Sequence, residues 1–283
     1  MTPDADLFEA AGLVCPVCSE RLELMGRSMG CPNGHRFDLA KHGYVSLLSG
    51  KGTSHRSDTP EMVASRTAVF NDGLYDPIMA AVAAAVPAGA GAVVDAAAGT
   101  GAYLAAALSA SADRRIGIAV DLSKSCARAA ARSHPRVVSV VADLWAQIPI
   151  ADRSADTVLS VFAPRNVTET ARVLGTGGRW VIVTPNPDHL AEIVEPMGML
   201  RVGDGKTERL AVDLAGSFEI CSQERVSARL DLTAARLADI AGMGPAGFHR
   251  TRPELDAAAH ALAGDTTASA TLDVTVTVAR LAG

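Results

Sequence analysis

A chain of 283 residues, 48% hydrophobic and 20% charged, has room for one large domain, or for an ordinary domain and a small one. Its net charge of −5 excludes a protein that coats nucleic acid by bulk electrostatics, so any RNA-binding charge has to be local. The acids at Asp4, Asp6 and Glu9 argue against a secretory leader, and no charge-free apolar run is long enough to span a bilayer, which predicts a cytoplasmic protein without membrane contact.

Residues 1–48 are predicted to form a small zinc-binding module. Cys15 and Cys18 make one closely spaced pair, and Cys31 and His35 make a second, which is the spacing of a tetrahedral zinc site. Four protein ligands leave no open position on the metal, so the ion is predicted to be structural and to hold together a segment too short for a core of its own. The alternative is a set of ordinary core thiols and a buried histidine, which the paired spacing disfavours.

Residues 49–88 are predicted to contain a linker followed by helices. Residues 49–60 are small, polar and partly basic, which is typical of a linker or mobile loop. Residues 60–86 have a helical pattern in two pieces, interrupted near Asn71. Between residues 27 and 66 there are six basic and three acidic side chains, an excess that fits either a solvated surface or a contact with an RNA backbone.

Residues 89–283 alternate between short apolar strands and helical stretches. The predicted strands end at Asp95, Asp121 and Asp143 or span residues 157–162 and 179–184, and a late strand covers residues 272–278. Ser123 is predicted to cap the helix that runs to about Ser133. Repeated strand–helix units at this spacing predict a mainly parallel sheet with helices on both faces.

The loop Asp95-Ala-Ala-Ala-Gly99-Thr100-Gly101 follows the first of these strands and opens a helix. Glycines there let the backbone approach a ligand closely. A dinucleotide-binding loop would have a third glycine, which is missing, so the loop argues against a nicotinamide-dependent oxidoreductase. The acid at the strand end favours a loop around the amine of the methionine part of S-adenosylmethionine.

Two later acids extend this predicted cofactor site. Asp121 ends the second strand, where its carboxylate can accept both ribose hydroxyls. Asp143 ends the third, where it can meet the adenine amino group with Leu144 and Trp145 against the ring. Either acid alone has an ordinary explanation as a solvated loop residue or a helix cap, but three at successive strand ends favour a ligand. The predicted cofactor-binding set is Asp95, Ala97, Gly99, Thr100, Gly101, Asp121, Leu122, Asp143 and Leu144.

The fourth strand ends in Phe162-Ala163-Pro164-Arg165, at the edge that would face the methyl acceptor. Phe162 could stack on a base there, and the alternative is a strand-to-helix turn with a core phenylalanine. The two remaining cysteines, Cys126 and Cys221, lie in apolar contexts and are predicted to be small buried hydrophobic residues.

Several motifs occur together in an order that resembles the 23S rRNA (guanine-N1)-methyltransferases. They are Cys-Pro-Val-Cys at 15–18, Cys-Pro-Asn-Gly-His-Arg-Phe-Asp at 31–38, Gly43-Tyr44-Val45, the loop at 95–101, Phe162-Ala163-Pro164, and Thr184-Pro185 with His189-Leu190. The resemblance implies a Rossmann-like class I methyltransferase with a mainly parallel seven-stranded sheet, a zinc module that grips RNA, and a homodimer. One position departs from the pattern, because Ala97 replaces the first glycine of the usual cofactor loop.

The resemblance also implies a substrate, which is N1 of one guanine in a hairpin loop of domain II of 23S rRNA, and it favours the branch that confers resistance to tylosin- and mycinamicin-type macrolides. Guanine N1 carries a proton that a base has to remove. The expected catalytic group is Phe162, Pro164 and Arg165, which would hold a flipped guanine while Arg165 stabilises charge on O6. Two rival functions are a small-molecule methyltransferase and a non-catalytic RNA-binding protein on a methyltransferase fold.

Overall fold

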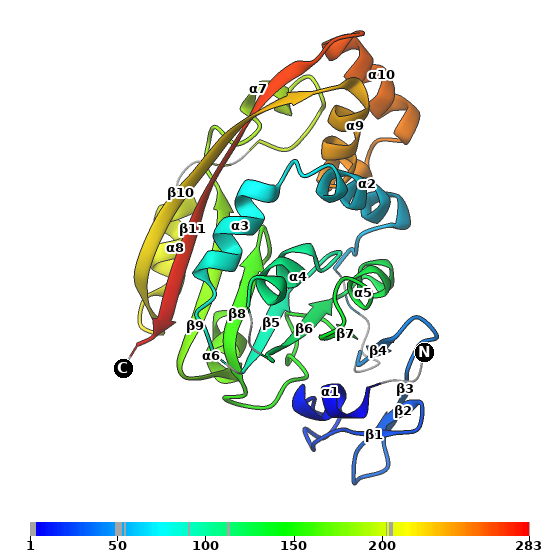
Figure 1. The fold of residues 1–283 in the computed structure, drawn as a ribbon, viewed down its shortest axis with the longest axis vertical. Helices are drawn as coiled ribbons and strands as arrows, with labels where there is room; N and C mark the ends of the chain where they lie inside the picture. The colour runs from blue at the N-terminus through cyan, green and yellow to red at the C-terminus, as the bar shows by residue number, and fades with distance from the viewer. Residues whose placement is uncertain are drawn as a thin grey trace.

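The computed structural model describes residues 4–48, 53, 55–89, 91–111, 114–201, 203 and 206–282, and the predicted linker at 49–60 therefore lies partly outside the described residues. The N-terminal module sits at one end of the molecule, a sheet with its helices occupies the middle, and two long C-terminal strands curve toward the other end (Figure 1). None of the described helices is long and apolar enough to cross a membrane.

The N-terminal module joins the main sheet instead of standing apart from it. Helix α1 (Ala5–Ala10) precedes a three-stranded antiparallel sheet of β1 (Glu23–Met25), β2 (Ser28–Gly30) and β3 (Arg36–Asp38). The next strand, β4 (Tyr44–Ser46), pairs in parallel with β7 (Val137–Val141). Every residue of β7 is buried, so β4 covers a sheet edge that would otherwise be open.

The described part of the main sheet has eight strands in the order β10-β11-β9-β8-β5-β6-β7-β4, and not the expected seven, because β4 adds one. The central strands are β5 (Ala92–Ala96), β6 (Ile116–Asp121), β7, β8 (Ala155–Val161) and β9 (Leu174–Pro185), all parallel. The helices α4 (Ala102–Ser109), α5 (Lys124–Ala130) and α6 (Val167–Val173) follow β5, β6 and β8. The predicted mainly parallel Rossmann-like class is confirmed, as is the Ser123 cap on α5, although that helix ends three residues before Ser133.

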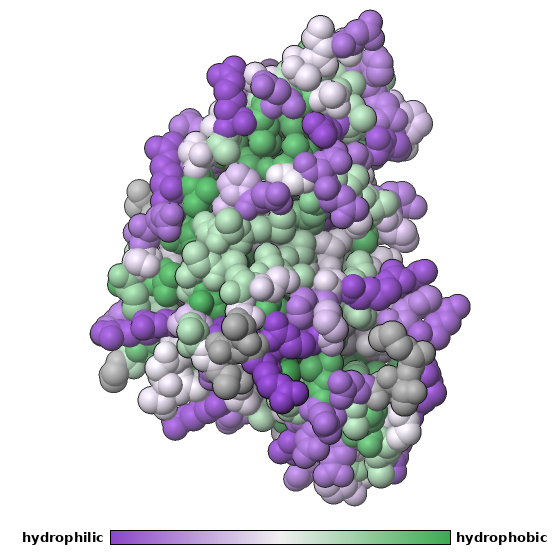
Figure 2. All heavy atoms as spheres, in the orientation of Figure 1, coloured by the Kyte–Doolittle hydropathy of each residue, from purple (hydrophilic) through white to green (hydrophobic). Residues whose placement is uncertain are grey.

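The helical pattern before the sheet forms two helices, as predicted. Helix α2 (Pro60–Asn71) begins at the Thr59 cap, and α3 (Asp76–Ala85) follows a turn in which Gly73 has a φ of 70°. The alanine-rich helices α3 and α4 give the middle of this face an apolar surface, with hydrophilic residues toward both ends (Figure 2). Because alanine side chains are short, these helices can lie close to the sheet.

The C-terminal part closes the sheet with two antiparallel strands. Helices α7 (Ala191–Val194) and α8 (Lys206–Leu214) precede β10 (Phe218–Leu232), and β11 (Ala268–Leu281) lies between β10 and β9. Between the two strands the chain forms α9 (Ala234–Gly242), the 3-10 helix η1 (Pro245–Phe248) and α10 (Arg252–Ala263). Helix α9 packs on α2, which brings this segment over the carboxyl ends of the central strands (Figure 1).

Candidate active site and zinc site

The four predicted zinc ligands converge on one point. Their donor atoms all lie within 4.8 Å of one another. The Sγ atoms of Cys18 and Cys31 are 3.7 Å apart, and Nδ1 of His35 lies 3.5, 3.5 and 3.2 Å from the sulfurs of Cys15, Cys18 and Cys31. A tetrahedral ion with Zn–S bonds of about 2.3 Å separates two sulfurs by about 3.8 Å. The donor set therefore fits a structural Zn²⁺ ion held by three thiolates and one imidazole.

The ligand pairs lie on tight turns. The N–H of Ser19 donates to the carbonyl of Cys15, and the N–H of Gly34 donates to the carbonyl of Cys31. Ser19 and Gly34 have φ values of 61° and 85°, so both turns use the left-handed region of backbone space. Gly34 is well suited to this conformation because it lacks a Cβ.

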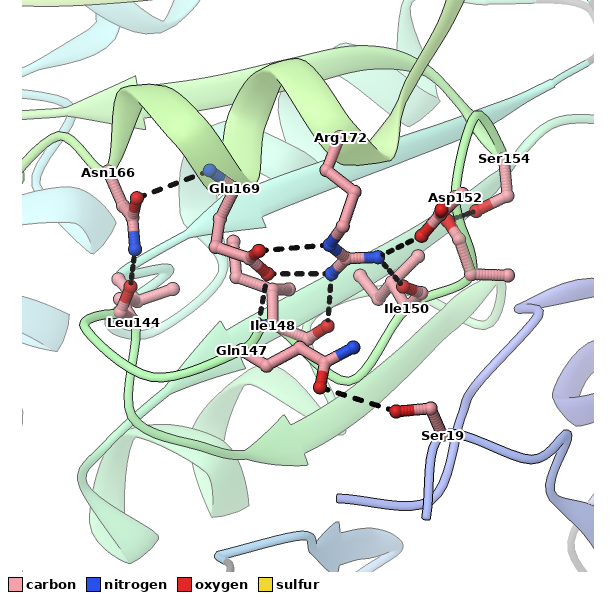
Figure 3. A network of polar contacts seen from close by, with 11 residues as sticks. Ser19, Leu144, Gln147, Ile148, Ile150, Asp152, Ser154, Asn166, Glu169 and Arg172 are labelled. Carbon is pink, nitrogen blue, oxygen red and sulfur yellow. Dashed lines mark hydrogen bonds and ion pairs between the residues drawn. The ribbon is translucent and has the colours of Figure 1, made fainter. Parts of the chain in front are cut away.

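A polar network ties the zinc module to the methyltransferase domain (Figure 3). The Ser19 hydroxyl lies 3.4 Å from Oε1 of Gln147, and the N–H of Val14 donates to the carbonyl of Pro149. On the other side of this loop, the Arg172 guanidinium donates to the carbonyls of Ile148 and Ile150 and to the Glu169 carboxylate. The loop after β7 is therefore held between the zinc module and α6.

The same network reaches the predicted cofactor site. Asn166 caps α6 with its side-chain oxygen, which accepts from the N–H of Glu169, and its Nδ2 donates to the carbonyl of Leu144 over 2.9 Å (Figure 3). Asp143 accepts the N–H of Trp145 at 3.0 Å. These contacts fix the segment after β7 that is predicted to face the adenine ring.

A cavity of about 500 Å³ opens at the carboxyl ends of the central strands. Most of the predicted site residues line it, namely Asp95, Ala97, Gly99, Asp121, Leu122, Asp143, Leu144, Phe162 and Pro164. Thr100 and Gly101 are not among the described lining residues: Thr100 is buried, and Gly101 is the N-terminal cap of α4 with a φ of 78°. The topology thus brings together residues from the ends of four strands, which is where open α/β sheets bind ligands.

Two carboxylates dominate the electrostatics of this cavity. Asp121 accepts hydrogen bonds from the N–H groups of Gly99 and Ser123, each over 2.8 Å, while burial raises its pKa to about 6. Burial and the charge of Asp121 raise the pKa of Asp95 to about 7. Among the described residues, Oδ2 of Asp95 has no hydrogen-bond partner. A buried carboxylate oxygen without a hydrogen-bond partner is costly, and the ammonium group of S-adenosylmethionine would donate to it.

The sequence analysis missed one cation that lines this cavity and whose charge acts on Asp121. The Arg66 guanidinium on α2 forms an ion pair with Asp58 and donates to the carbonyl of Met243 over 2.7 Å. The carbonyl of Asp58 in turn accepts from the Ser123 hydroxyl at 2.7 Å. Residues 55–58, which were predicted to belong to a linker, line the cavity instead. The contact that places Asp58 joins residues 65 apart in the sequence, and the contact that places Arg66 joins residues 177 apart. No local sequence pattern predicts contacts of this kind.

Aromatic rings form the wall of the cavity beside the end of β8. The Phe162 ring is 6.3 Å from the Tyr75 ring and 5.5 Å from the His189 ring, and Phe70 lies 5.3 Å from Tyr103. Phe162 is 40% exposed, so it is not a core residue, and its ring can meet a planar ligand. Three non-glycine residues with positive φ also line this cavity, namely Ala97 (67°), Phe162 (53°) and Leu190 (56°). Strained backbone of this kind tends to gather at functional sites.

Ala97→Gly is expected to stabilise the protein. The φ of 67° at Ala97 costs a residue with a Cβ about 1–2 kcal/mol, which glycine avoids. Glycine also increases the conformational entropy of the unfolded chain, which offsets part of this benefit. We therefore expect the free energy of unfolding to rise by about 1 kcal/mol and the melting temperature by about 2–4 °C. Ala98→Gly, at the next, buried position without positive φ, is the matched control and should lower the melting temperature. Thermal unfolding measures both, and a lower melting temperature for Ala97→Gly would contradict the strain argument.

The structure differs from two expectations drawn from the sequence, one for Arg165 and one for Cys221. Arg165 forms an ion pair with Asp213 on α8 over 3.2 Å and is not among the described residues that line the cavity. Cys126 is fully buried as predicted, but Cys221 is exposed. The prediction for Cys221 was wrong because it lies on β10, whose side chains along this stretch face solvent at the edge of the sheet.

Comparison with known proteins gives a family match for each of the two parts of the chain. Residues 13–51 match the zinc-ribbon family described as "RlmA, N-terminal", and residues 94–182 match the family described as "Methyltransferase domain". A solved S-adenosylmethionine-dependent methyltransferase from Thiobacillus denitrificans, in complex with S-adenosyl-L-homocysteine, aligns with 81% of this chain and 95% of its own, at 16% identity and a TM-score of 0.47. The fold and the two sites define a class I S-adenosylmethionine-dependent methyltransferase that carries a zinc ribbon.

Two curated relatives narrow this class. A 23S rRNA (guanine(748)-N(1))-methyltransferase from Streptomyces fradiae is 44% identical over 95% of this chain and 96% of its own length. A Micromonospora griseorubida protein, provisionally named a 23S rRNA (guanine-N(1)-)-methyltransferase, is 40% identical over 91% of this chain and 94% of its own. The chain belongs to the 23S rRNA (guanine-N1)-methyltransferase family.

Proposed function

We propose that this protein methylates N1 of a guanine in a hairpin loop of domain II of 23S rRNA and thereby confers resistance to tylosin- and mycinamicin-type macrolides. The observation that carries the proposal is one cavity lined both by Asp95, whose Oδ2 has no hydrogen-bond partner among the described residues, and by the aromatic rings of Phe162 and His189. The name of the Streptomyces fradiae relative supports the choice of substrate. We further propose that the protein works in the cytoplasm and that it is a homodimer. Light scattering would test the oligomeric state.

The acidic side of the cavity would hold the cofactor. Asp95 would receive the ammonium group, Asp121 the ribose hydroxyls, and Asp143 the adenine amino group, beside Leu122 and Leu144. Bound S-adenosylmethionine supplies an electrophilic methyl group that N1 accepts as the carbon–sulfur bond breaks, after the N1 proton has gone to a base. The N–H of Gly99 donates a hydrogen bond to the Asp121 carboxylate, and this contact would hold the loop at residues 95–101 in place for the ligand.

The aromatic side of the cavity would hold the acceptor base. A guanine that leaves its stack in an RNA loop can be bound between aromatic and apolar side chains. Phe162 and Pro164 at the end of β8 would form one surface, with Tyr75 edge-on to Phe162. Binding of this kind accelerates methyl transfer by positioning the reacting atoms. The expected contact of Arg165 with O6 would require its ion pair with Asp213 to open.

A local basic surface would bind the RNA backbone. Lys41 in the zinc module and Arg128 and Arg132 at α5 are exposed. Burial, and after it the charges of Arg128, Lys41 and Arg132, lower the pKa of His42, so we assign the three cations to one surface around that ring. Such a surface reconciles RNA binding with a net charge of −5.

Replacing Lys41 and Arg128 together by alanine is expected to raise KM for RNA by about tenfold at physiological salt. The slope of log affinity against log salt should also become shallower by about 1.5, since each lost phosphate contact removes about 0.7–0.9. Affinity for S-adenosylhomocysteine should stay unchanged. Arg280→Ala, on β11 toward the opposite edge of the sheet, is the control for loss of an exposed arginine. An unaltered salt slope in the double variant would remove this surface from the RNA interface.

The proposed reaction is tested with labelled S-adenosylmethionine and a transcript of domain II of 23S rRNA. Methylation at N1 blocks base pairing, so primer extension should stop at a single guanine in one hairpin loop. A stop elsewhere would change the target, and no label on RNA, with cofactor binding shown by calorimetry, would favour a small-molecule methyltransferase. Absence of cofactor binding would favour the non-catalytic RNA-binding protein.

A further inference from the structure

His189 belongs to the wall of the cavity that would receive the base. It lies in the turn after β9, is 9% exposed, and lines the cavity beside Phe162. Its ring is tilted by 31° to the Phe162 ring and stands nearly perpendicular to the Tyr75 ring, at centroid distances of 5.5 and 6.4 Å. A base in contact with Phe162 would therefore also come within reach of the imidazole.

The hydrogen-bonding role of each His189 ring nitrogen follows from one main-chain contact. Nδ1 lies 3.2 Å from the backbone nitrogen of Asp273 on β11, and this N–H can only donate. Nδ1 is therefore the acceptor nitrogen. In a neutral imidazole the hydrogen is then on Nε2, so the ring is a hydrogen-bond donor through Nε2 and cannot act there as the base for N1.

The turn that carries His189 is held rigidly. The Asp273 carboxylate is fully buried and accepts two hydrogen bonds from the Arg225 guanidinium, each over 2.7 Å, and a third from Nδ2 of Asn186 over 2.9 Å. The N–H of His189 donates to the carbonyl of Asn186, and that of Leu190 to the carbonyl of Thr271 at 2.7 Å. A donor fixed in advance is effective at stabilising charge that develops during a reaction.

We propose that His189 is a catalytic residue that donates a hydrogen bond from Nε2 to O6 of the target guanine. This inference rests on the proposed methylation of guanine N1. Loss of the N1 proton places negative charge on O6, which a donor at this position stabilises. Because adenine has an amino group at position 6, the same donor also makes the site specific for a 6-oxo purine.

Two amide variants separate this role from a structural one. In His189→Asn the side-chain oxygen can take the place of Nδ1 and accept the N–H of Asp273, but no donor reaches the position of Nε2. In His189→Gln the amide nitrogen reaches that position, while the acceptor for Asp273 is lost. We expect kcat/KM on RNA to fall about 100-fold in His189→Asn, the usual cost of removing one charge-stabilising donor. In His189→Gln the fall should be no more than about tenfold. Both variants should bind S-adenosylhomocysteine as the wild type does.

A transcript with inosine at the target position extends the test, because inosine keeps O6 and N1 but lacks the 2-amino group. The wild type should methylate it, and His189→Asn should lose the same factor on it as on guanine. A higher kcat/KM in His189→Asn than in His189→Gln, or equal values in both, would overturn the proposal. So would full activity of His189→Asn beside an inactive Arg165→Ala. Failure of the wild type to methylate the guanine transcript would refute the proposed function itself, before any variant is compared.

Discussion

Cys31→Ser is expected to release the zinc ion and to abolish methylation of RNA while cofactor binding remains. Cys31 is buried and supplies one of the four ligand atoms that lie within 4.8 Å of one another, and a structural zinc site contributes about 10–16 kcal/mol to the folding of such modules. Its loss should unfold the turns that carry Ser19 and Gly34 and lower the melting temperature. Metal analysis should fall from one zinc per chain to none.

The effect should stay largely within the module and its RNA contacts. The cavity is lined by segments from residue 55 onward, so calorimetry with S-adenosylhomocysteine should give an affinity within a few-fold of the wild type. Cys221→Ser, an exposed thiol on β10, is the matched control and should keep zinc and activity. Retention of one zinc per chain in Cys31→Ser would show that Cys31 is not a ligand, and normal methylation without zinc would separate the module from catalysis.

The sequence was sufficient to predict those site residues whose positions depend on short stretches of the chain, namely the strand-end carboxylates and the zinc ligands. The carboxylates of Asp95 and Asp121 could be placed because each lies at or next to the end of a short apolar strand, and parallel strands bring their carboxyl ends to one edge. The zinc ligands could be found because their spacing within a short segment already fixes most of the geometry. For Phe162 the sequence left two possibilities open, a base-stacking ring and a core phenylalanine, and its 40% exposure after β8 favours the first.

The parts that escaped prediction depend on long-range contacts or on exposed strands. Arg66 reaches the site only because α2 packs on α9, far along the chain. The first half of β10 is mostly exposed and polar, and only its second half, from Val226 to Leu232, alternates between apolar and polar residues. The sequence analysis assigned no strand there, and the pairing of β10 with β11 is what places Arg225 on Asp273. The residues of β4 were assigned to the zinc module, because a strand of three residues is too short for its sequence to show which sheet it joins.

Cofactor affinity is expected to rise with pH through the titration of Asp95. Burial, reinforced by the charge of Asp121, raises the pKa of Asp95 to about 7 in the protein without cofactor. A cationic ligand prefers the ionised carboxylate, so binding below pH 7 has to release a proton. The dissociation constant of S-adenosylmethionine should therefore be about tenfold larger at pH 6 than at pH 7.5, with a contribution of the same sign from Asp121, whose pKa is about 6.

The free protein should show the opposite trend in stability. Because the pKa of Asp95 is higher in the folded state than in the unfolded chain, where it is about 3.9, the folded state binds more protons between these values. The free energy of unfolding should therefore fall as pH rises from about 4 to 7, while the stabilisation gained from cofactor grows over the upper part of that range. Calorimetry and thermal unfolding at several pH values measure both. Asp95→Asn, which keeps the size of the side chain without its titration, should flatten most of the pH dependence, and an Asp95→Asn protein with the wild-type pH profile would assign the titration to another group.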